Sequence, residues 1–428
     1  MLTSLFTGVS GMSANGMALS VISDNVANMN TTGFKTSRAV FGDILSQQLG
    51  ESQVGRGVVL TDVAPEFNQG TFENTSSVLD MAVDGNGLFI LNDSSGTSYT
   101  RAGQFSVDKD GYVVNPGGSR LQGYGFSATG TASSGLGDIN VSSKNSAPNS
   151  TQNVTINANI DSTSTIPAAF DITDPYNTSN FSSSITVYDS LGNGHIVNVY
   201  FRKSVQAATG NTWEWFGVVN GTDSASGTTE IQAQGTLGFT NNGELDTESA
   251  ITYPLASSGF DFNGGAATGQ VIDFDFGTAI TTDGGTGLDG TTQFGAASST
   301  SFQNQDGYSS GSLKSITISP DGIMTGIFTN GQTRGIAQIA LAKFIAPTGL
   351  TKMGKGLYAE SVGSGQPIIS TPGVSGTGSL LSNTLELSNV DLAEEFVKMI
   401  LSQRGFQANS RVISTSDELM VELVNLKR

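Results

Sequence analysis

Large apolar side chains recur at steps of three and four residues at both ends of the chain. Near the N-terminus the recurring residues are Leu2, Leu5, Val9, Met12, Leu19 and Val26. Near the C-terminus, between about residues 391 and 425, they are Leu392, Phe396, Met399, Phe406, Ile413, Met420 and Val424. Because this is the spacing of the a and d positions of heptad helices, it predicts one long amphipathic helix at each end.

The long middle of the chain has a different pattern, in which short alternating runs are separated by Asp-Gly and Asn-Gly turns. The predicted strands lie within residues 81–91, 99–107, 112–114, 315–318, 323–328 and 335–344. A clearer hairpin is predicted from residues 184–188 and 195–201, which flank a turn of residues 189–194. Residues 36–70, 127–183 and 255–312 carry too little periodicity for an assignment.

The strand signals before residue 146 and after residue 310 resemble each other, which indicates one inner β domain interrupted by an inserted outer one. We therefore predict a mainly β fold with α-helical coiled-coil termini and nested β domains. The predicted parts are a terminal helical coiled-coil domain of residues 1–30 with 388–428, a connecting region of 31–70 with 372–387, an inner β domain of 71–145 with 311–371, and an inserted outer β domain of 146–310.

The N-terminal helix would be weak on its own. It contains Gly8, Gly11 and Gly16, and each glycine costs about 1 kcal/mol relative to alanine in a helix interior. Burial of the large side chains would reverse that balance, and the glycines would then allow close helix approach. We hypothesise that folding is coupled to assembly, with partners from the other terminal helix or from neighbouring copies. Two ordinary core helices packed on the body are the alternative.

The C-terminal helix has stronger local signals. Asp391 is placed to cap its N-terminus, and Glu394 follows three residues later in a capping-box arrangement. Glu394 and Lys398 form a favourable i,i+4 pair. Both terminal segments carry almost none of the net negative charge of the chain, which suits close packing of many copies.

Composition narrows the class of protein. The charged fraction of 13% and the 55 glycines suit short strands and turns. The absence of cysteine excludes disulfides and thiolate metal sites. The net charge of −18 argues against nucleic-acid binding, which needs clustered Lys and Arg. No continuous apolar run is long enough to span a membrane and residues 2–34 contain no Lys or Arg, so we expect neither membrane insertion nor a cleaved signal peptide.

Two kinds of residue in the middle of the chain invite a functional interpretation. His195 is the only histidine and follows a Gly-Asn-Gly turn, so we expect a solvent-facing turn residue and not a catalytic group. Trp213 and Trp215 alternate around Glu214, which places both rings on one strand face, and we expect core packing there. The 37 acidic residues leave room for a carboxylate pair of the glycosidase type.

Two loops resemble binding motifs but are incomplete. Residues 349–356 nearly spell a phosphate-binding loop, yet Gly356 stands where Ser or Thr would hold magnesium, and Pro367 with its neighbouring glycines excludes the helix required next. Residues 108–111 resemble the start of a calcium loop without its later ligands, and a β-turn explains them. We therefore predict no catalytic, cofactor-binding or metal site, and a protein that is not an enzyme.

An Asn-rich segment follows the N-terminal helix, and Gly33 before the aromatic Phe34 predicts a helix stop with a left-handed residue. In this segment Asn25, Asn28, Asn30, Thr31, Thr32, Gly33 and Phe34 resemble the N-terminal signature of bacterial flagellar rod and hook proteins. Residues 79–89 and 99–106 resemble the inner β domain of the same group, and residues 389–392 and 402–409 resemble its C-terminal segment.

Three features favour hook proteins over rod proteins within this family. Residues 188–195 are similar to a hairpin of the hook outer domain, and residues 330–354 resemble the hook return strand. The chain is also longer than distal rod proteins, which lack the large insert. Residues 127–310 otherwise match only in character.

The resemblance implies a structural subunit of the flagellar hook, the curved, flexible tube that transmits torque from rod to filament. Its partners would be further copies of itself, the hook cap protein, the distal rod protein, the hook–filament junction protein and the flagellar export gate, with an extracellular location. Phe41 and Leu45 fit an element that such substrates show to the export gate. Another axial protein of the rod or the hook–filament junction is the alternative, and a secreted β-rich adhesin or glycan-cleaving enzyme is the alternative from a different class.

Overall fold

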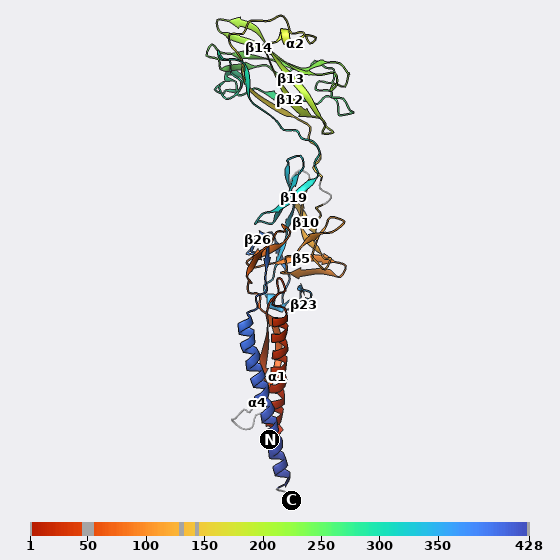
Figure 1. Cartoon of the computed structure of the whole chain (residues 1–428), viewed down its shortest axis with the longest axis vertical. Coiled ribbons are helices and arrows are strands. Elements are labelled where there is room, and N and C mark those ends of the chain that lie inside the picture. Colours follow the sequence, from red (N-terminus) through yellow and green to blue (C-terminus); the bar gives the residue numbers. More distant parts are fainter. Residues whose placement is uncertain (1, 45–54, 128–131, 142–144, 426–428) are drawn as a thin grey trace. The chain divides into compact units, whose positions relative to one another are not determined.

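The computed structural model describes residues 2–44, 55–127, 132–141 and 145–425. It confirms a mainly β fold with a long helix at each end of the chain (Figure 1). By its internal contacts the chain divides into two compact units. Unit 1 comprises Met1–Lys144, Leu313–Ile327 and Thr333–Arg428, and unit 2 comprises Asn145–Ser312 and Phe328–Gln332. The predicted four-part division is finer than these units and stays a prediction.

The two terminal helices lie side by side in unit 1 (Figure 1). They are α1 (Leu2–Ala27) and α4 (Leu392–Asn425). A hairpin of β1 (Ser37–Asp43) and β2 (Val58–Pro65) packs along α1. The predicted cap of α4 is confirmed, because Asp391 Oδ1 accepts hydrogen bonds from the backbone N–H groups of Ala393 at 2.8 Å and Glu394 at 3.2 Å.

The rest of unit 1 is built from short strands. In chain order they are β3 (Phe72–Asn74), β4 (Met81–Asp84), β5 (Leu88–Asp93), β6 (Gly96–Thr100), β7 (Ser106–Val107), β8 (Val113–Val114), β9 (Arg120–Phe126), β10 (Ala132–Asp138), β19 (Leu313–Ile318), β20 (Ile323–Phe328), β21 (Thr333–Ile339), β22 (Leu341–Lys343), β23 (Thr351–Gly354), β24 (Leu357–Ala359), β25 (Ile368–Ser370), β26 (Ser379–Ser382) and β27 (Thr384–Glu386), with a 3₁₀ turn, η1 (Pro347–Gly349), before β23.

Most of these strands join one large sheet. Its main order is β19-β20-β21-β9-β5-β6-β24-β23, while β26 pairs with β4 and β27 pairs with β3. Met81, Phe89 and Ile339 are fully buried in its largest core cluster. The strands that follow the insert therefore complete a core begun by the strands that precede it, because β21 pairs with β9.

Unit 2 contains two sheets and two one-turn helices. Its elements are β11 (Asn153–Asn159), α2 (Pro175–Thr178), β12 (Phe181–Tyr188), β13 (Gly194–Ala207), β14 (Gly210–Val219), β15 (Glu230–Phe239), β16 (Leu245–Glu248), β17 (Asp273–Asp275), α3 (Ile280–Asp283) and β18 (Ser299–Gln305). The strands β12 to β16 form a five-stranded meander, and β17, β11 and β18 form a second sheet. The predicted hairpin is β12 with β13.

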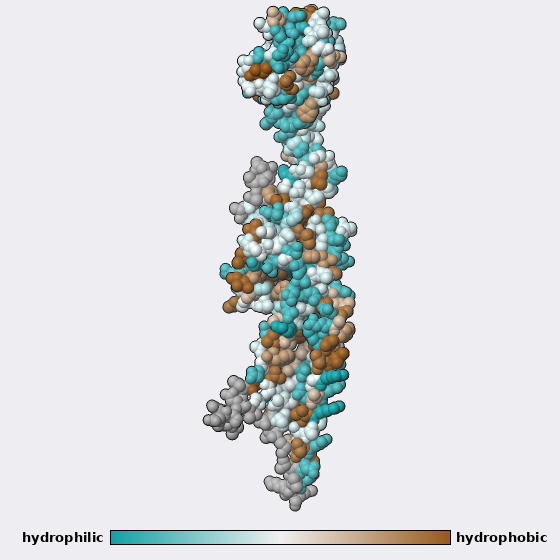
Figure 2. All heavy atoms as spheres, turned by 90° about the vertical axis from the view of Figure 1, so that its left-hand side faces the viewer, coloured by the Kyte–Doolittle hydropathy of each residue, from teal (hydrophilic) through white to brown (hydrophobic). Residues whose placement is uncertain are grey.

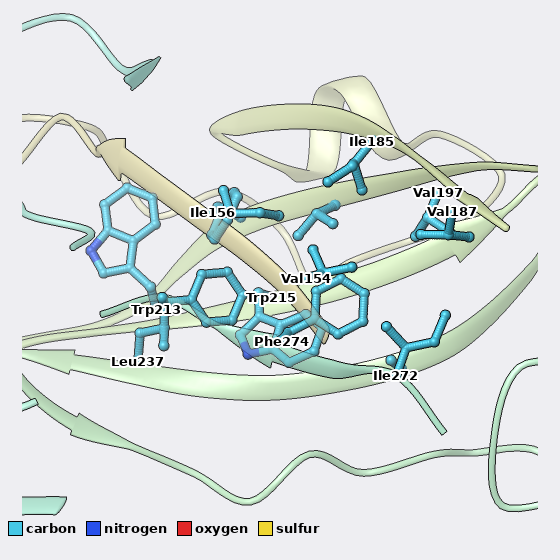
Figure 3. Packing of buried hydrophobic residues seen from close by; sticks show 14 of the residues in the cluster. Val154, Ile156, Ile185, Val187, Val197, Trp213, Trp215, Leu237, Ile272 and Phe274 are labelled. Atoms are coloured by element: carbon cyan, nitrogen blue, oxygen red, sulfur yellow. The ribbon is translucent and has the colours of Figure 1, made fainter. Parts of the chain in front are cut away.

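The core of unit 2 combines aromatic and aliphatic side chains. Trp213 and Trp215 point into it from β14, as the alternation around Glu214 predicted, and Figure 3 shows them among the aliphatic side chains of the neighbouring strands. The rings of Trp215 and Phe274 lie 5.1 Å apart between centroids. Phe274 comes from β17, so the two sheets share this core.

The prediction of a solvent-facing His195 is wrong. The side chain is 4% exposed, and its Nε2 lies 3.0 Å from Asp189 Oδ2. The ring stacks on Phe262 with 4.4 Å between centroids. Phe262 lies far along the chain, in a stretch that shows no periodicity, which is why the local turn pattern alone suggested exposure.

The two incomplete loops form turns. Residues 349–356 run from η1 through β23 into the tight turn before β24, with Lys355 and Gly356 both at positive φ, so no helix follows as a phosphate-binding loop would require. In the loop that begins at Asp108, the carboxylate accepts hydrogen bonds from the backbone N–H groups of Asp110 at 2.9 Å and Tyr112 at 2.8 Å. The Asp108 side chain therefore organises a β-turn.

Candidate assembly surface of the terminal helices

The contact between α1 and α4 runs through small and polar residues. A Cβ atom at Gly11 would lie 2.8 Å from Asn409 Oδ1, and one at Gly405 would lie 2.7 Å from Asn15 Oδ1. A Cβ atom at Gly8 would meet an Ile413 side-chain carbon at 3.0 Å. The helices are therefore closer than two rows of large side chains would allow.

This contact stripe follows a heptad of its own. On α1 it includes Ser4, Gly8, Gly11, Asn15 and Asn25, which are again three or four residues apart or a multiple of such steps. Ser4 Oγ and Ser416 Oγ lie 3.4 Å apart near the chain ends. Sequence reasoning recognised that glycines would permit close approach, but it followed the larger residues one position further along and missed this stripe.

Asn25 of the family signature ties three elements together. Its side chain is 1% exposed. Oδ1 accepts a hydrogen bond from Ser37 N at 2.9 Å, and Nδ2 donates to Ser37 O at 2.9 Å and to Glu395 Oε2 at 3.1 Å. Glu395 also pairs with Lys398 at 2.8 Å. Asn25 thus links the C-terminal end of α1 to β1 and to the first turn of α4.

A buried ionic cluster lies where the helices meet the strands. Glu386 Oε1 accepts from Lys35 Nζ at 2.6 Å and from Gly70 N at 2.9 Å, and its Oε2 accepts from Arg101 Nε at 2.5 Å. Burial alone would raise the pKa of Glu386, but the charges of Arg101 and Lys35 and their hydrogen bonds outweigh it and lower that pKa. Burial also lowers the pKa of Lys35, against the opposing effect of Glu386.

Other signature residues shape the turn after α1. Asn28 Nδ2 donates to Asp24 Oδ1 at 3.1 Å, and its Oδ1 accepts from Thr31 Oγ1 at 3.1 Å. Gly33 has a φ of +68°, and a Cβ there would lie 2.5 Å from Ala102 N, so both the backbone conformation and the close approach require glycine. The left-handed residue predicted at this position is confirmed.

The remaining signature residues lie nearer the surface. Asn30 is exposed, and Thr32 and Phe34 are half-buried. Lys352 Nζ lies 5.1 Å from the centroid of the Phe34 ring and donates to Ser37 Oγ at 2.5 Å. This places a cation of β23 against the start of the connecting segment.

The residues predicted to form the subunit interface fall into three groups. Those half-buried in the single chain are Leu5, Met12, Leu19, Val26, Leu392, Met399, Ile413 and Met420. Val9, Phe396 and Phe406 are exposed, by 44%, 50% and 42%. The side chains of Leu2 and Val424, and the whole of Leu45, lie outside the described residues. The interface assignment itself stays a prediction.

α4 exposes large apolar side chains on the sides that α1 does not cover. They are Phe396, Val397, Ile400, Leu401, Phe406, Val412, Leu419 and Val421. α1 adds Phe6, which is 64% exposed. Figure 2 shows hydrophobic residues among the hydrophilic ones on the surface of the terminal helices. Exposed large apolar residues gathered along one helix mark an interaction site, so these residues form a candidate assembly surface.

The β1–β2 hairpin extends this apolar surface. Its exposed apolar residues are Val40, Phe41, Val59 and Val63. A groove of about 310 Å³ opens between β1 and the two helices, with Ala18, Ile22, Phe41 and Leu401 among its lining residues. Phe41 of the predicted export element is therefore partly accessible and borders the helices.

One described helix segment, Ser4–Ala27 of α1, is long and apolar enough to cross a membrane by length and composition alone. This differs from the expectation drawn from continuous apolar runs, because the glycines, serines and threonines of α1 lower its mean hydropathy only slightly. In the fold this segment packs against α4 and the β1–β2 hairpin. Its polar Asn25 and Ser4 contact α4.

Comparison with protein families gives four matches along the chain. Residues 5–35 match the family described as flagella basal body rod protein. Residues 82–161 match the flagellar hook protein FlgE/F/G D1 domain, and residues 159–308 match the flagellar basal body protein FlaE D2 domain. Residues 381–426 match the C-terminal family of flagellar basal body rod FlgEFG proteins.

Curated relatives match over the whole length. The flagellar hook protein FlgE of Borreliella burgdorferi is 35% identical, with 100% of both chains covered. The FlgE of Salmonella typhimurium is 34% identical, with 98% of both chains covered. Among solved structures, Helicobacter pylori flagellar hook protein FlgE2 is similar with a TM-score of 0.48 and 15% identity, covering 73% of this chain and 100% of that one.

Proposed function

The chain belongs to the family of flagellar hook proteins, FlgE, and we propose that it is the structural subunit that polymerises into a curved, flexible tube coupling the rod to the filament. Full-length similarity to curated hook proteins supports the flagellar role. The terminal helices supply the physical means of polymerisation, through the candidate assembly surface described above.

The observation that carries the proposal is the exposed apolar surface of α4. Among the residues of this helix whose side chains the structure describes, eight large apolar ones are exposed in the single chain. Full burial of each would contribute roughly 1.5 to 3 kcal/mol. Half-burial in an assembly would still favour association over the isolated subunit, and the near-neutral charge of the terminal segments adds little repulsion.

We propose that two kinds of helix contact act in the tube, one within each subunit and one between subunits. Small residues such as Gly11 and Gly405 hold α1 against α4 within one subunit, whereas large residues such as Phe396 and Phe406 pack between subunits. The predicted interface residues Val9, Phe396 and Phe406 belong to the second kind. Helix pairs of many copies would then line the tube in a coiled-coil arrangement.

The strand-built parts would lie outside the helices and slide past their neighbours as the curved tube turns. The segments that form these parts are rich in Ser, Thr, Asn and Gly and poor in Lys and Arg. Contacts of this kind are weak and readily exchanged through water. This composition supports a flexible joint and requires no catalytic group.

We further propose an extracellular location, reached through the flagellar export gate without cleavage. Its partners there would be the hook cap protein, the distal rod protein and the hook–filament junction protein. Phe41, accessible on β1, and Leu45 would form the element that the gate recognises. N-terminal sequencing of the secreted protein tests the last point, because an N-terminus well inside the first thirty residues would contradict export without cleavage.

Electron microscopy of the purified, concentrated protein tests the main proposal. We expect curved tubes. Straight short rods would instead indicate another axial protein, and dispersed monomers at all concentrations would contradict polymerisation. Hydrolytic activity on glycans by such monomers would favour the enzyme alternative.

A further inference from the structure

One corner of unit 2 is held together by hydrogen bonds between β16 and α3. The backbone N–H of Glu248 donates to Thr282 Oγ1 at 2.9 Å. Thr281 Oγ1 donates to Asp246 Oδ1 at 2.6 Å. These bonds attach the short helix α3 to the strand β16.

This corner covers the main core of unit 2. Leu245, Phe276 and Ala279 are at most 1% exposed and belong to the cluster around the two tryptophans. The Leu245 N–H also donates to the Gly287 carbonyl at 2.9 Å. Opening of the corner would expose these apolar side chains to water, so the attachment of α3 to β16 stabilises the unit.

The Glu248 side chain lies among carboxylates at this corner. Asp283 belongs to α3, and Asp275 and Asp273 belong to β17. The Glu248 Oε1 atom is buried with no hydrogen-bond partner among the described residues, while the Phe276 backbone forms a hydrogen bond to the side chain. Burial, followed by the three aspartates, raises the pKa of Glu248 to about 7.

We propose that this corner is a proton-controlled latch, closed while the Glu248 carboxyl carries a proton and loosened when it ionises. As a neutral acid, Glu248 meets the three aspartates without charge repulsion and has an O–H to donate. As a carboxylate it adds a fourth like charge, and the charged groups that act on it are all acidic. Repulsion then weakens the attachment of α3 to β16.

The direction of the pH dependence follows from where the proton binds more tightly. The ordinary pKa of a glutamate carboxyl is 4.5, whereas that of Glu248 in the folded unit is about 7. The folded state therefore binds the proton more tightly than the unfolded chain. The stabilisation is fully present below about pH 4.5 and is lost as the pH rises through about 7.

The chain offers a selective probe of this unit. Its only two tryptophans, Trp213 and Trp215, lie in the core of unit 2, so tryptophan fluorescence follows thermal unfolding of that unit within the full chain. We expect the wild-type midpoint to fall between about pH 5.5 and pH 8.5 by roughly 5 °C more than that of Glu248→Gln, which mimics the neutral acid.

A matched control and a second variant make the test decisive. Glu244→Gln changes a nearby carboxylate that accepts from Thr240 Oγ1 at 3.1 Å, and it should keep the wild-type pH dependence. Asp283→Asn removes one neighbouring charge but keeps an oxygen for the Ala279 N–H, which Asp283 Oδ2 accepts at 3.0 Å. Asp283→Asn should reduce the pH dependence of the unfolding midpoint, and it tests the proposal by itself if Glu248→Gln fails to fold.

Hydrogen exchange locates the effect. After correction for the intrinsic pH dependence of exchange, amides of residues 276–291 should exchange faster at about pH 8.5 in the wild type but not in Glu248→Gln. The proposal is overturned if Asp283→Asn and a folded Glu248→Gln both retain the full wild-type change in midpoint, or if Glu244→Gln abolishes it equally.

Discussion

At the scale of single residues, the attachment of the helices depends on one carboxylate. Glu386 is 0% exposed and accepts hydrogen bonds from Lys35 and Arg101. Lys35 lies between α1 and β1, and Arg101 directly follows β6. Arg101 also donates to the carbonyl of Val83 at 2.6 Å and to that of Gly85 at 2.7 Å. Because both cations are buried, each depends on Glu386 for its counter-charge.

Replacing this carboxylate should destabilise unit 1 strongly. Glu386→Gln leaves two buried cations without a counter-charge, a change that typically costs about 3–5 kcal/mol. Urea unfolding followed by far-UV circular dichroism measures the loss, while tryptophan fluorescence reports unit 2 separately. Glu360→Gln, at an exposed position, is the control. Equal stability of the two variants would contradict the role given to Glu386.

The same group predicts a pH dependence of opposite sign to that of Glu248. The pKa of Glu386 is lowered in the folded state, so its stabilisation is present above the ordinary pKa of 4.5 and is lost as the pH falls towards the lowered value. Glu386→Gln should therefore flatten the acid side of the stability profile of unit 1. An unchanged acid profile would show that other carboxylates dominate it.

At the scale of elements, sequence patterns predicted correctly those features that depend on residues close together in the chain. Asp391 marks the start of α4 and Gly33 marks the turn after α1, because caps and left-handed residues depend on neighbours in sequence. The β1–β2 hairpin was not assignable, since most of its apolar residues remain exposed. The strand β17 was missed because its pairing partner, β11, lies more than a hundred residues earlier.

The helix contact shows a second limit of sequence patterns. Apolar periodicity follows the largest residues, and here most of them lie beside the α1–α4 contact, although Ile413 meets Gly8 within it. The stripe of Gly8, Gly11 and Asn15 carries no hydrophobic signal, although its spacing is regular. The pattern therefore predicted the two helices, whereas most of the residues that join them within one chain were not identified.

Substitutions at two glycines of α1 distinguish the α1–α4 contact within one chain from the rest of the helix surface. Gly11→Leu would place a side chain where a Cβ alone meets Asn409 at 2.8 Å, whereas a Cβ at Gly16 meets nothing within 4 Å. We expect Gly11→Leu to separate α1 from α4 and abolish tubes. Gly16→Leu should retain the α1–α4 contact and gain helix propensity of up to about 1 kcal/mol.

Disulfide cross-linking reads out the contact in the single chain. Cysteines introduced at Ser4 and Ser416, whose Oγ atoms lie 3.4 Å apart, should cross-link readily in the otherwise cysteine-free chain and in Gly16→Leu, but slowly in Gly11→Leu. Efficient cross-linking in Gly11→Leu would mean that the small-residue stripe does not set the helix distance.

At the scale of the whole molecule, folding and polymerisation should be separable. As far as the structure describes the side chains, the cores around Phe89 in unit 1 and around Trp215 in unit 2 contain no residue of either terminal helix. A chain of residues 31–390 keeps Lys35 with Glu386 and loses both helices. We expect it to show the cooperative tryptophan unfolding of the full chain and to remain monomeric in sedimentation at all concentrations. Tubes formed by this shortened chain would place the polymerisation surface elsewhere.

A single charge on the assembly surface should have nearly the same effect on polymerisation as that deletion. Phe406 is 42% exposed in the single chain, so Phe406→Asp leaves the charge hydrated and the chain folded. In a tube, the same aspartate would be buried between helices without a partner, at a cost of several kcal/mol in every copy. We expect no tubes by electron microscopy, together with unchanged tryptophan unfolding.

Gln407→Asp adds the same charge at the next, already polar and exposed position and should still form tubes. Curved tubes from Phe406→Asp would show that α4 does not pack between subunits through this residue.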